Sequence, residues 1–243
     1  CDLFERLRQL RLQQPSMSFR VECSYLEIYN ERVFDLLSEG PGGHAAAPKS
    51  VGGAAVAGDE LRVRQDPVSG PFVDGLTTHA VCDEVQITAL IRRGNNERHV
   101  AATRINDRSS RSHAIMALLL TQTHLLDDGS ITKTVSKVNL VDLAGSERTA
   151  DSGVAGHHFR EATKINLSLT TLGRVIDALA DRSGPAAAGA TSSFAQQASA
   201  SSTASSAGAA PAAGTSTFLP PYRESLLTWL LMDSLGGNSR TSM

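Results

Sequence analysis

The sequence has few cysteines, no excess of either charge and no long hydrophobic run. Its three cysteines lie far apart without a C-x-x-C pair, so neither a disulfide framework nor a zinc site is predicted, and a reducing compartment fits best. The 23 basic and 25 acidic side chains leave a formal net charge of −2, which disfavours a nucleic-acid binder that relies on bulk positive charge. No apolar run approaches the ~20 residues of a membrane span, so no direct membrane insertion is expected.

The chain does contain enough apolar sequence to build a core. It has 243 residues, of which 41% are hydrophobic, and this length allows one large domain or two small ones. The first residues are charged and amphipathic, unlike a signal peptide, and there is no starting methionine. We therefore expect a fragment of a longer protein.

Two segments differ in composition from the rest, at about residues 39–59 and 183–219. The first is mostly Gly, Ala and Pro, and the second is rich in Ala and Ser and contains no charged residue. Neither has an apolar pattern that could offset the entropy of ordering it, so both are predicted to be mobile low-complexity insertions.

The remaining sequence alternates between helical and strand periodicity. Apolar spacing predicts helices over about 3–13, 83–94 and 158–180, with a last one from near Pro221 to 236–237. Asp83 is expected to cap the second helix and Gly94 to end it. Strands are predicted at 19–25, 61–64, 114–121 and 134–143, the last two joined by a hairpin over 127–129. Strands that alternate with helices favour an α/β layered sheet.

The strongest local signal is residues 138–147, which read Val-Asn-Leu-Val-Asp-Leu-Ala-Gly-Ser-Glu. An apolar strand that ends in Asp142 places a carboxylate at its carboxyl end, where α/β sheets bind ligands. In a nucleotide-hydrolysing protein such a carboxylate can hold Mg²⁺ through water, and Gly145 can offer its backbone N–H to a terminal phosphate. The alternative is a buried strand that ends in an ordinary turn.

The second signal is residues 106–113, Asn-Asp-Arg-Ser-Ser-Arg-Ser-His, directly before an apolar strand. Clustered hydroxyls can ligate a hard cation and orient a water, while Arg111 can pair with a carboxylate. The alternative is a polar loop whose serines cap backbone groups. A serine hydrolase built on Ser112 and His113 is disfavoured, because adjacent residues seldom place a nucleophile against its base.

Together these segments resemble kinesin motor domains. The resemblance covers nearly the whole chain apart from the two insertions. It rests on segments 24–37, 106–113, 142–148, 165–169 with 172–173, and 221–225 with 233–238, in the order found in that family. Segments 61–64, 70–73 and 170–173 look most like the third kinesin family. The resemblance implies an α/β fold with a central mostly parallel or mixed sheet, helices on both faces, and residues 1–243 as an incomplete motor domain.

The resemblance also implies roles for residues in both signals. Segment 106–113 resembles switch I and 142–147 resembles switch II of an ATPase that uses ATP and Mg²⁺. Asn106 would contribute to the nucleotide site, Ser110 and Asp142 would hold Mg²⁺, and Ser109 would help to position the attacking water. Arg111 would pair with Glu147 as a latch, and Gly145 would sense the γ-phosphate.

By the same resemblance, the helix over 158–180 and the helix from Pro221 would lie on the microtubule. The basic side chains expected there are Arg160, Lys164, Arg174 and Arg223. Leu167 and Leu226 stand where kinesins usually carry Lys, so the basic face is thinned, and both leucines could instead be buried. The uncharged insertion at 183–219 also lacks the Lys-rich character common in the third family.

The phosphate loop G-x-x-x-x-G-K-[ST] does not occur in these 243 residues. Residues 43–50 look superficially similar, but Pro48 would remove a needed backbone N–H. We therefore expect the intact protein to be a microtubule-stimulated ATPase of the cytoplasmic cytoskeleton, with cargo bound through other regions, and this chain alone to be inactive. The alternative is a non-hydrolysing kinesin-like module that binds microtubules.

Overall fold

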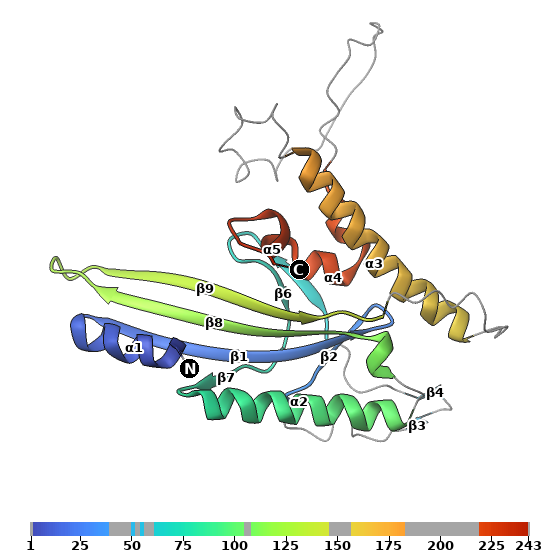
Figure 1. Cartoon of the computed structure of the whole chain (residues 1–243), viewed down its shortest axis with the longest axis horizontal. Helices are drawn as coiled ribbons and strands as arrows, with labels where there is room; N and C mark the ends of the chain where they lie inside the picture. The colour runs from blue at the N-terminus through green and yellow to red at the C-terminus, as the bar shows by residue number, and fades with distance from the viewer. Residues whose placement is uncertain are drawn as a thin grey trace, which may run out of the picture.

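A computed structural model of the chain describes residues 2–38, 50–51, 54–55, 61–104, 108–145, 157–182 and 219–242. Within them, five strands form a sheet in the order β2-β1-β8-β9, with β7 also paired to β1 (Figure 1). These strands are β1 (Met17–Tyr29), β2 (Arg32–Asp35), β7 (His79–Val81), β8 (His113–Leu125) and β9 (Ile131–Asp142). All pairings between these five strands are antiparallel.

Helices lie on both faces of this sheet, as predicted for the α/β class (Figure 1). On one face α1 (Asp2–Gln13) and α2 (Glu84–Arg104) pack on the odd-numbered side chains of β1, among them Val21 and Cys23. On the other face α3 (His157–Arg182), α4 (Leu226–Leu230) and α5 (Met232–Gly236) lie over Leu26 and Ile28. Because successive side chains of β1 point to opposite faces of the sheet, this strand contributes to two separate apolar cores.

Local periodicity placed most of these elements correctly. The predicted helix before Pro15, the hairpin between β8 and β9 and the long helix α3 are confirmed. Asp83 caps α2 as predicted, since its carboxylate accepts a hydrogen bond from the backbone N–H of Gln86 at 2.8 Å. The strand predicted over 61–64 is only partly confirmed, because Val63 and Arg64 lie in β5 (Val63–Asp66), whereas Leu61 forms an isolated bridge to Val33. β5 pairs with β6 (Gly70–Val73) in a separate two-stranded sheet.

The expectation that Gly94 ends the second helix is wrong, because α2 continues through it to Arg104. A Cβ built at Gly94 would lie 2.2 Å from Cδ1 of Tyr25. The glycine therefore lets the helix approach the ring of a strand residue, and it does not act as a C-cap. The neighbouring Asn95 accepts a hydrogen bond from the Tyr25 hydroxyl at 2.9 Å, which fixes the helix on the strand.

The single last helix predicted from Pro221 is also wrong, because the segment forms three short pieces. These are η2 (Tyr222–Glu224), α4 and α5. Ser225 is extended, with φ −143° and ψ 145°, and its hydroxyl accepts from the N–H of Leu227 as an N-cap. Leu231 separates α4 from α5. The predicted apolar positions of this segment are therefore correct, but the segment is not one continuous helix.

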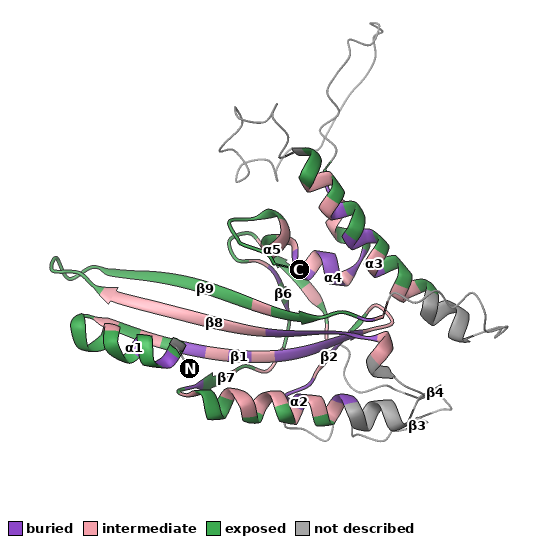
Figure 2. Cartoon of the chain, viewed as in Figure 1, coloured by how far each residue is buried: buried purple, intermediate pink, exposed green. Residues whose placement is uncertain are grey.

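The outer edge of the sheet is formed by β9. Almost every β9 residue is exposed, on both faces of the strand, including Val135, Val138 and Leu140 (Figure 2). In the part of the chain that the structure describes, β9 pairs with β8 alone.

The two predicted low-complexity insertions lie outside the described residues, except for one short ladder. It joins β3 (Ser50–Val51) to β4 (Ala54–Ala55). Within the described residues, none of the helices has the length and apolar character to cross a membrane.

Candidate functional site

The two sequence signals meet at one end of the sheet. Because β8 and β9 are antiparallel, with Ala114 opposite Asp142, the start of β8 and the end of β9 lie side by side. The short 3-10 helix η1 (Arg108–Arg111) directly precedes β8. The backbone N–H of Gly145 donates to the carbonyl of Ser110 at 2.9 Å, so the two segments touch through their main chains.

The Asp142 carboxylate is held by Arg98 of α2. Nη1 of Arg98 lies 2.8 Å from Oδ2 of Asp142, whose side chain is 70% exposed, whereas that of Arg98 is 9% exposed. The same guanidinium approaches both the carbonyl and the hydroxyl of Ser112 at 3.4 Å. Arg98 therefore joins the end of β9 to the residues just before β8.

Behind Arg98 lies a second carboxylate, that of Glu27 on β1. Its side chain is fully buried, and its Oε1 lies 3.8 Å from Nε of Arg98. Sequence analysis missed both residues. A signal was present, because Glu27 continues the alternating series of Val21, Cys23 and Tyr25, and a carboxylate at an inward strand position needs a cation nearby.

His113, the last residue of the second signal, is 3% exposed and bonds to two other segments. Its Nδ1 accepts from the backbone N–H of Ala144 at 3.0 Å, and its Nε2 lies 2.7 Å from the hydroxyl of Ser168 on α3. The ring thus contacts α3 and the residues that follow β9. Its partners in the described part of the chain are therefore Ser168 and Ala144, and not its neighbour Ser112.

The turn between β1 and β2 contacts α3 and α4. Asn30 and Glu31 both have left-handed backbone, with φ of 57° and 56°, which a two-residue hairpin turn requires. Nζ of Lys164 donates to the Asn30 carbonyl at 3.1 Å. Oε2 of Glu31 accepts from the N–H of Leu226 at 2.9 Å, so the carboxylate caps α4.

Burial raises the pKa of Glu31, against the lowering effects of the Leu226 N–H and of Lys164. A carboxyl with a raised folded-state pKa contributes most to stability at low pH, and the contribution is lost as the pH rises through that pKa. At pH 7 we expect Glu31→Gln to match or exceed the wild-type stability, since the amide oxygen still accepts from Leu226. Glu31→Ala should cost about 0.5–2 kcal/mol, as for a lost helix cap. Thermal melts of both variants at pH 5 and pH 8 check this. A Gln variant as unstable as the Ala variant would contradict it.

The remaining basic residues predicted on the helix face differ in their surroundings. Arg174 forms a bidentate ion pair with Glu224 of η2. The guanidinium of Arg223 lies 5.5 Å from the ring centroid of Trp229, whose indole N–H donates to Gln65 on β5 at 3.1 Å. Of the four residues, Lys164, Arg174 and Arg223 therefore all have partners within the chain. Arg160 lies in α3, but its side chain is outside the described residues.

The side chains of three residues of the predicted nucleotide site lie outside the described part of the structure. Asn106 and Glu147 lie outside the described residues, and for Ser109 only the backbone position in η1 is described. The predicted latch between Arg111 and Glu147 therefore stays a prediction. Gly145 contacts Ser110, and Asp142 lies opposite Ala114 at the start of β8, whereas the roles of these residues at a nucleotide site stay predictions.

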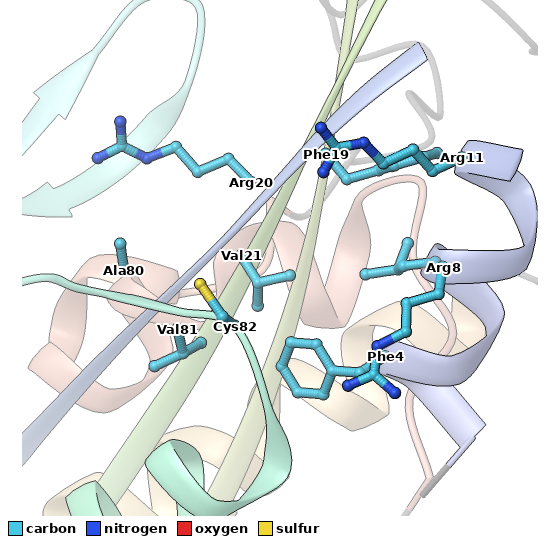
Figure 3. A pocket seen from close by; sticks show the side chains of 10 residues that line it. Phe4, Arg8, Arg11, Phe19, Arg20, Val21, Ala80, Val81 and Cys82 are labelled. Atoms are coloured by element: carbon cyan, nitrogen blue, oxygen red, sulfur yellow. The ribbon is translucent and has the colours of Figure 1, made fainter. Parts of the chain in front are cut away.

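A pocket of about 250 Å³ lies elsewhere, between α1, β1 and β7 (Figure 3). Phe4, Val21 and Val81 line it together with Arg8, Arg11 and Arg20. It contains none of the predicted site residues.

Comparison with known proteins identifies the relatives of this chain. The family model for the kinesin motor domain matches residues 1–243. Human kinesin-like protein KIF13A is 45% identical over 244 residues, and unc-104 of Caenorhabditis elegans is 41% identical over 243. Each alignment covers 100% of this chain, but only 11% of KIF13A and 13% of unc-104, so the chain spans a small part of these relatives.

Solved structures give the same result. A KIF14 dimer in its two-heads-bound state, with AMP-PNP and in complex with a microtubule, is 36% identical with a TM-score of 0.70. KIF14 with ADP in complex with a microtubule is 37% identical with a TM-score of 0.71. The alignments cover all of this chain and 55% and 56% of those chains, and they confirm the predicted α/β class.

Proposed function

The chain belongs to the kinesin motor-domain family, and from this premise we propose that the protein carrying it is an ATP-driven motor on cytoplasmic microtubules. The observation that carries the proposal is the contact between Gly145 and Ser110, which joins the two motif segments through the main chain. Phosphoryl transfer needs positioning and charge neutralisation more than covalent chemistry, and backbone contacts of this kind supply positioning.

The donors at this end of the sheet fit Mg²⁺. The Ser110 hydroxyl and the Asp142 carboxylate are hard oxygen donors, and the Asp142 side chain is open to solvent. Among the described residues, no group of three or more His, Cys, Asp and Glu side chains gathers. This agrees with an ion held by one carboxylate and by the phosphates of its substrate. When bound, Mg²⁺ neutralises charge on the transferring phosphates.

The roles of the chain's own residues follow from this arrangement. Ser110 and Asp142 would hold Mg²⁺, while Arg98 orients the Asp142 carboxylate. Gly145 would offer to the γ-phosphate the same N–H that donates to the Ser110 carbonyl in this structure. Asn106 and Ser109 complete the nucleotide site and position the attacking water, and Arg111 pairs with Glu147.

A second candidate is a kinesin-like module that binds microtubules without hydrolysing ATP. One observation favours it: Lys164 and Arg174 are engaged inside the chain. Steady-state ATPase assays on the full protein, with and without microtubules, separate the candidates. Microtubule-stimulated turnover supports the motor. Co-sedimentation with microtubules without any turnover supports the module.

The microtubule face can be probed at Leu167 and Leu226. Leu167 is 42% exposed, so Leu167→Lys should be tolerated and should tighten microtubule binding about two- to fivefold at low salt, the scale of one exposed ion pair. Leu226 packs against the core cluster around Leu227, so Leu226→Lys should lower the melting temperature instead.

Co-sedimentation across a salt series and a melting curve for each variant check these expectations. The gain of Leu167→Lys should fade as the Debye length falls from ~10 Å at 0.1 M to ~3 Å at 1 M salt. A gain that persists at 1 M salt would contradict an electrostatic origin. An unchanged melting temperature for Leu226→Lys would contradict its burial.

A further inference from the structure

His113 is at the centre of a short chain of hydrogen bonds that runs from the end of β9 to α3. The backbone N–H of Ala144 lies 3.0 Å from Nδ1, Nε2 lies 2.7 Å from the Ser168 hydroxyl, and that hydroxyl lies 2.7 Å from the carbonyl of Ile165. Ala144, His113 and Ser168 are 5%, 3% and 1% exposed. Water therefore does not compete for these bonds.

The three hydrogen bonds are all donated in the same direction, from Ala144 toward the Ile165 carbonyl. Nδ1 faces an N–H donor, so it carries no proton, and the neutral ring must carry its proton on Nε2. The Ser168 hydroxyl donates its only proton to the Ile165 carbonyl, so it accepts from Nε2. A proton added to Nδ1 would face the Ala144 N–H directly.

The electrostatic surroundings keep the ring in this neutral form. Burial, and next the positive charge of Arg98, lower the pKa of His113 to about 4, while Asp142 acts in the opposite direction. At neutral pH the ring is therefore uncharged, and the hydrogen-bond chain is complete.

The position of Ser168 on α3 means that these hydrogen bonds connect the helix to the end of β9. Among residues 163–181 of α3, for which side chains are described, the buried residues are Ser168, Thr171, Leu172 and Val175. The helix packs mainly on α4 and η2, so His113 gives it a direct polar bond to the sheet. Residues 143–145 follow the carboxylate of Asp142, and they contact η1 through Gly145.

We propose that His113 is a positioning residue that couples residues 143–145 to α3 through Ser168. A displacement of the Ala144 backbone moves the ring, and the ring moves the buried face of the helix. The coupling rests on the proposed function, in which residues 143–145 respond to nucleotide and α3 responds to the microtubule.

Ser168→Ala in the full protein is the main test. It removes the link to α3 and leaves the nucleotide side intact, so basal ATP turnover should stay within about twofold of wild type. Microtubule-stimulated kcat should fall about tenfold, the scale of a typical coupling between sites. Thr170→Ala, which removes an exposed hydroxyl from the same helix, is the matched control and should change neither rate.

Variants of the ring test the two bonds separately. His113→Asn retains an acceptor near Ala144 but cannot reach Ser168, whereas His113→Gln retains a donor toward Ser168 and loses that acceptor. Both should lower stimulated turnover. Adding Ser168→Ala to His113→Asn should cause little further loss, because both changes break the same link.

The possible outcomes separate the coupling from the proposed function. A wild type that microtubules do not stimulate overturns both. A stimulated wild type whose Ser168→Ala variant loses basal and stimulated turnover by the same factor, or loses neither, overturns the coupling alone. A ¹⁵N spectrum of the wild-type imidazoles does not need any variant to fold. We expect a proton on Nε2 of His113 at neutral pH, and a proton on Nδ1 would overturn the coupling.

Discussion

Replacing Arg98 with methionine should lower the free energy of unfolding by about 3–5 kcal/mol, the cost of breaking a buried ion pair from one side. The substitution leaves the fully buried Glu27 carboxylate without the cation 3.8 Å away. It also releases Asp142 and removes the bonds to Ser112. Urea denaturation measures the loss.

Two further variants test whether the loss of stability comes from removing the positive charge beside Glu27. Arg92→Met, at an exposed position of the same helix, should change stability by less than about 0.5 kcal/mol. Glu27→Gln added to Arg98→Met should recover most of the loss, because no uncompensated charge then remains in the core. If Arg98→Met were as mild as Arg92→Met, the pair with Glu27 would have no part in stability.

The largest expected effect on turnover is at Arg111 and Glu147. In the full protein, Arg111→Ala and Glu147→Ala should each lower microtubule-stimulated kcat by on the order of a hundredfold or more, as when one preorganised polar partner is removed from an active site. The double variant should be little worse than either single variant, since residues that act as one unit are strongly non-additive. Steady-state kinetics on all three variants measure this.

Arg111→Lys sharpens the test of the latch. It keeps the positive charge but loses the planar fork that binds a carboxylate through two parallel bonds, so it should rescue little of the loss. Fully additive losses in the double variant would show that the two side chains do not work as a pair. Recovery by Lys would show that charge alone is required.

The sequence predicted those parts of the fold that depend on local periodicity. The strand β1, the hairpin of β8 and β9 and the helix α3 all have a clear apolar period and turn residues at their ends. The errors arose where a distant contact decides the local structure. At Gly94, any side chain would clash with the ring of Tyr25. At Ser225 a new helix begins, and the distant Glu31 carboxylate also caps its N-terminus.

The same distinction applies to the candidate site. Sequence analysis assigned the two motifs to one nucleotide site through their resemblance to a single family. It did not find Arg98, Glu27 or the bond from His113 to Ser168, since these side chains come from α2, β1 and α3 and meet only in the folded chain. It also could not foresee that Lys164 and Arg174 bond within the chain.

The exposed edge of β9 has a consequence for solubility. An open strand edge is a template on which another extended chain can add, and it is a common starting point of aggregation. Lys133 and Lys137 lie on this strand. If two copies paired antiparallel about Val135, Lys133 of one copy would face Lys137 of the other, and like charges directly opposite each other are destabilising. The strand, as the described residues show it, thus resists self-pairing in that register.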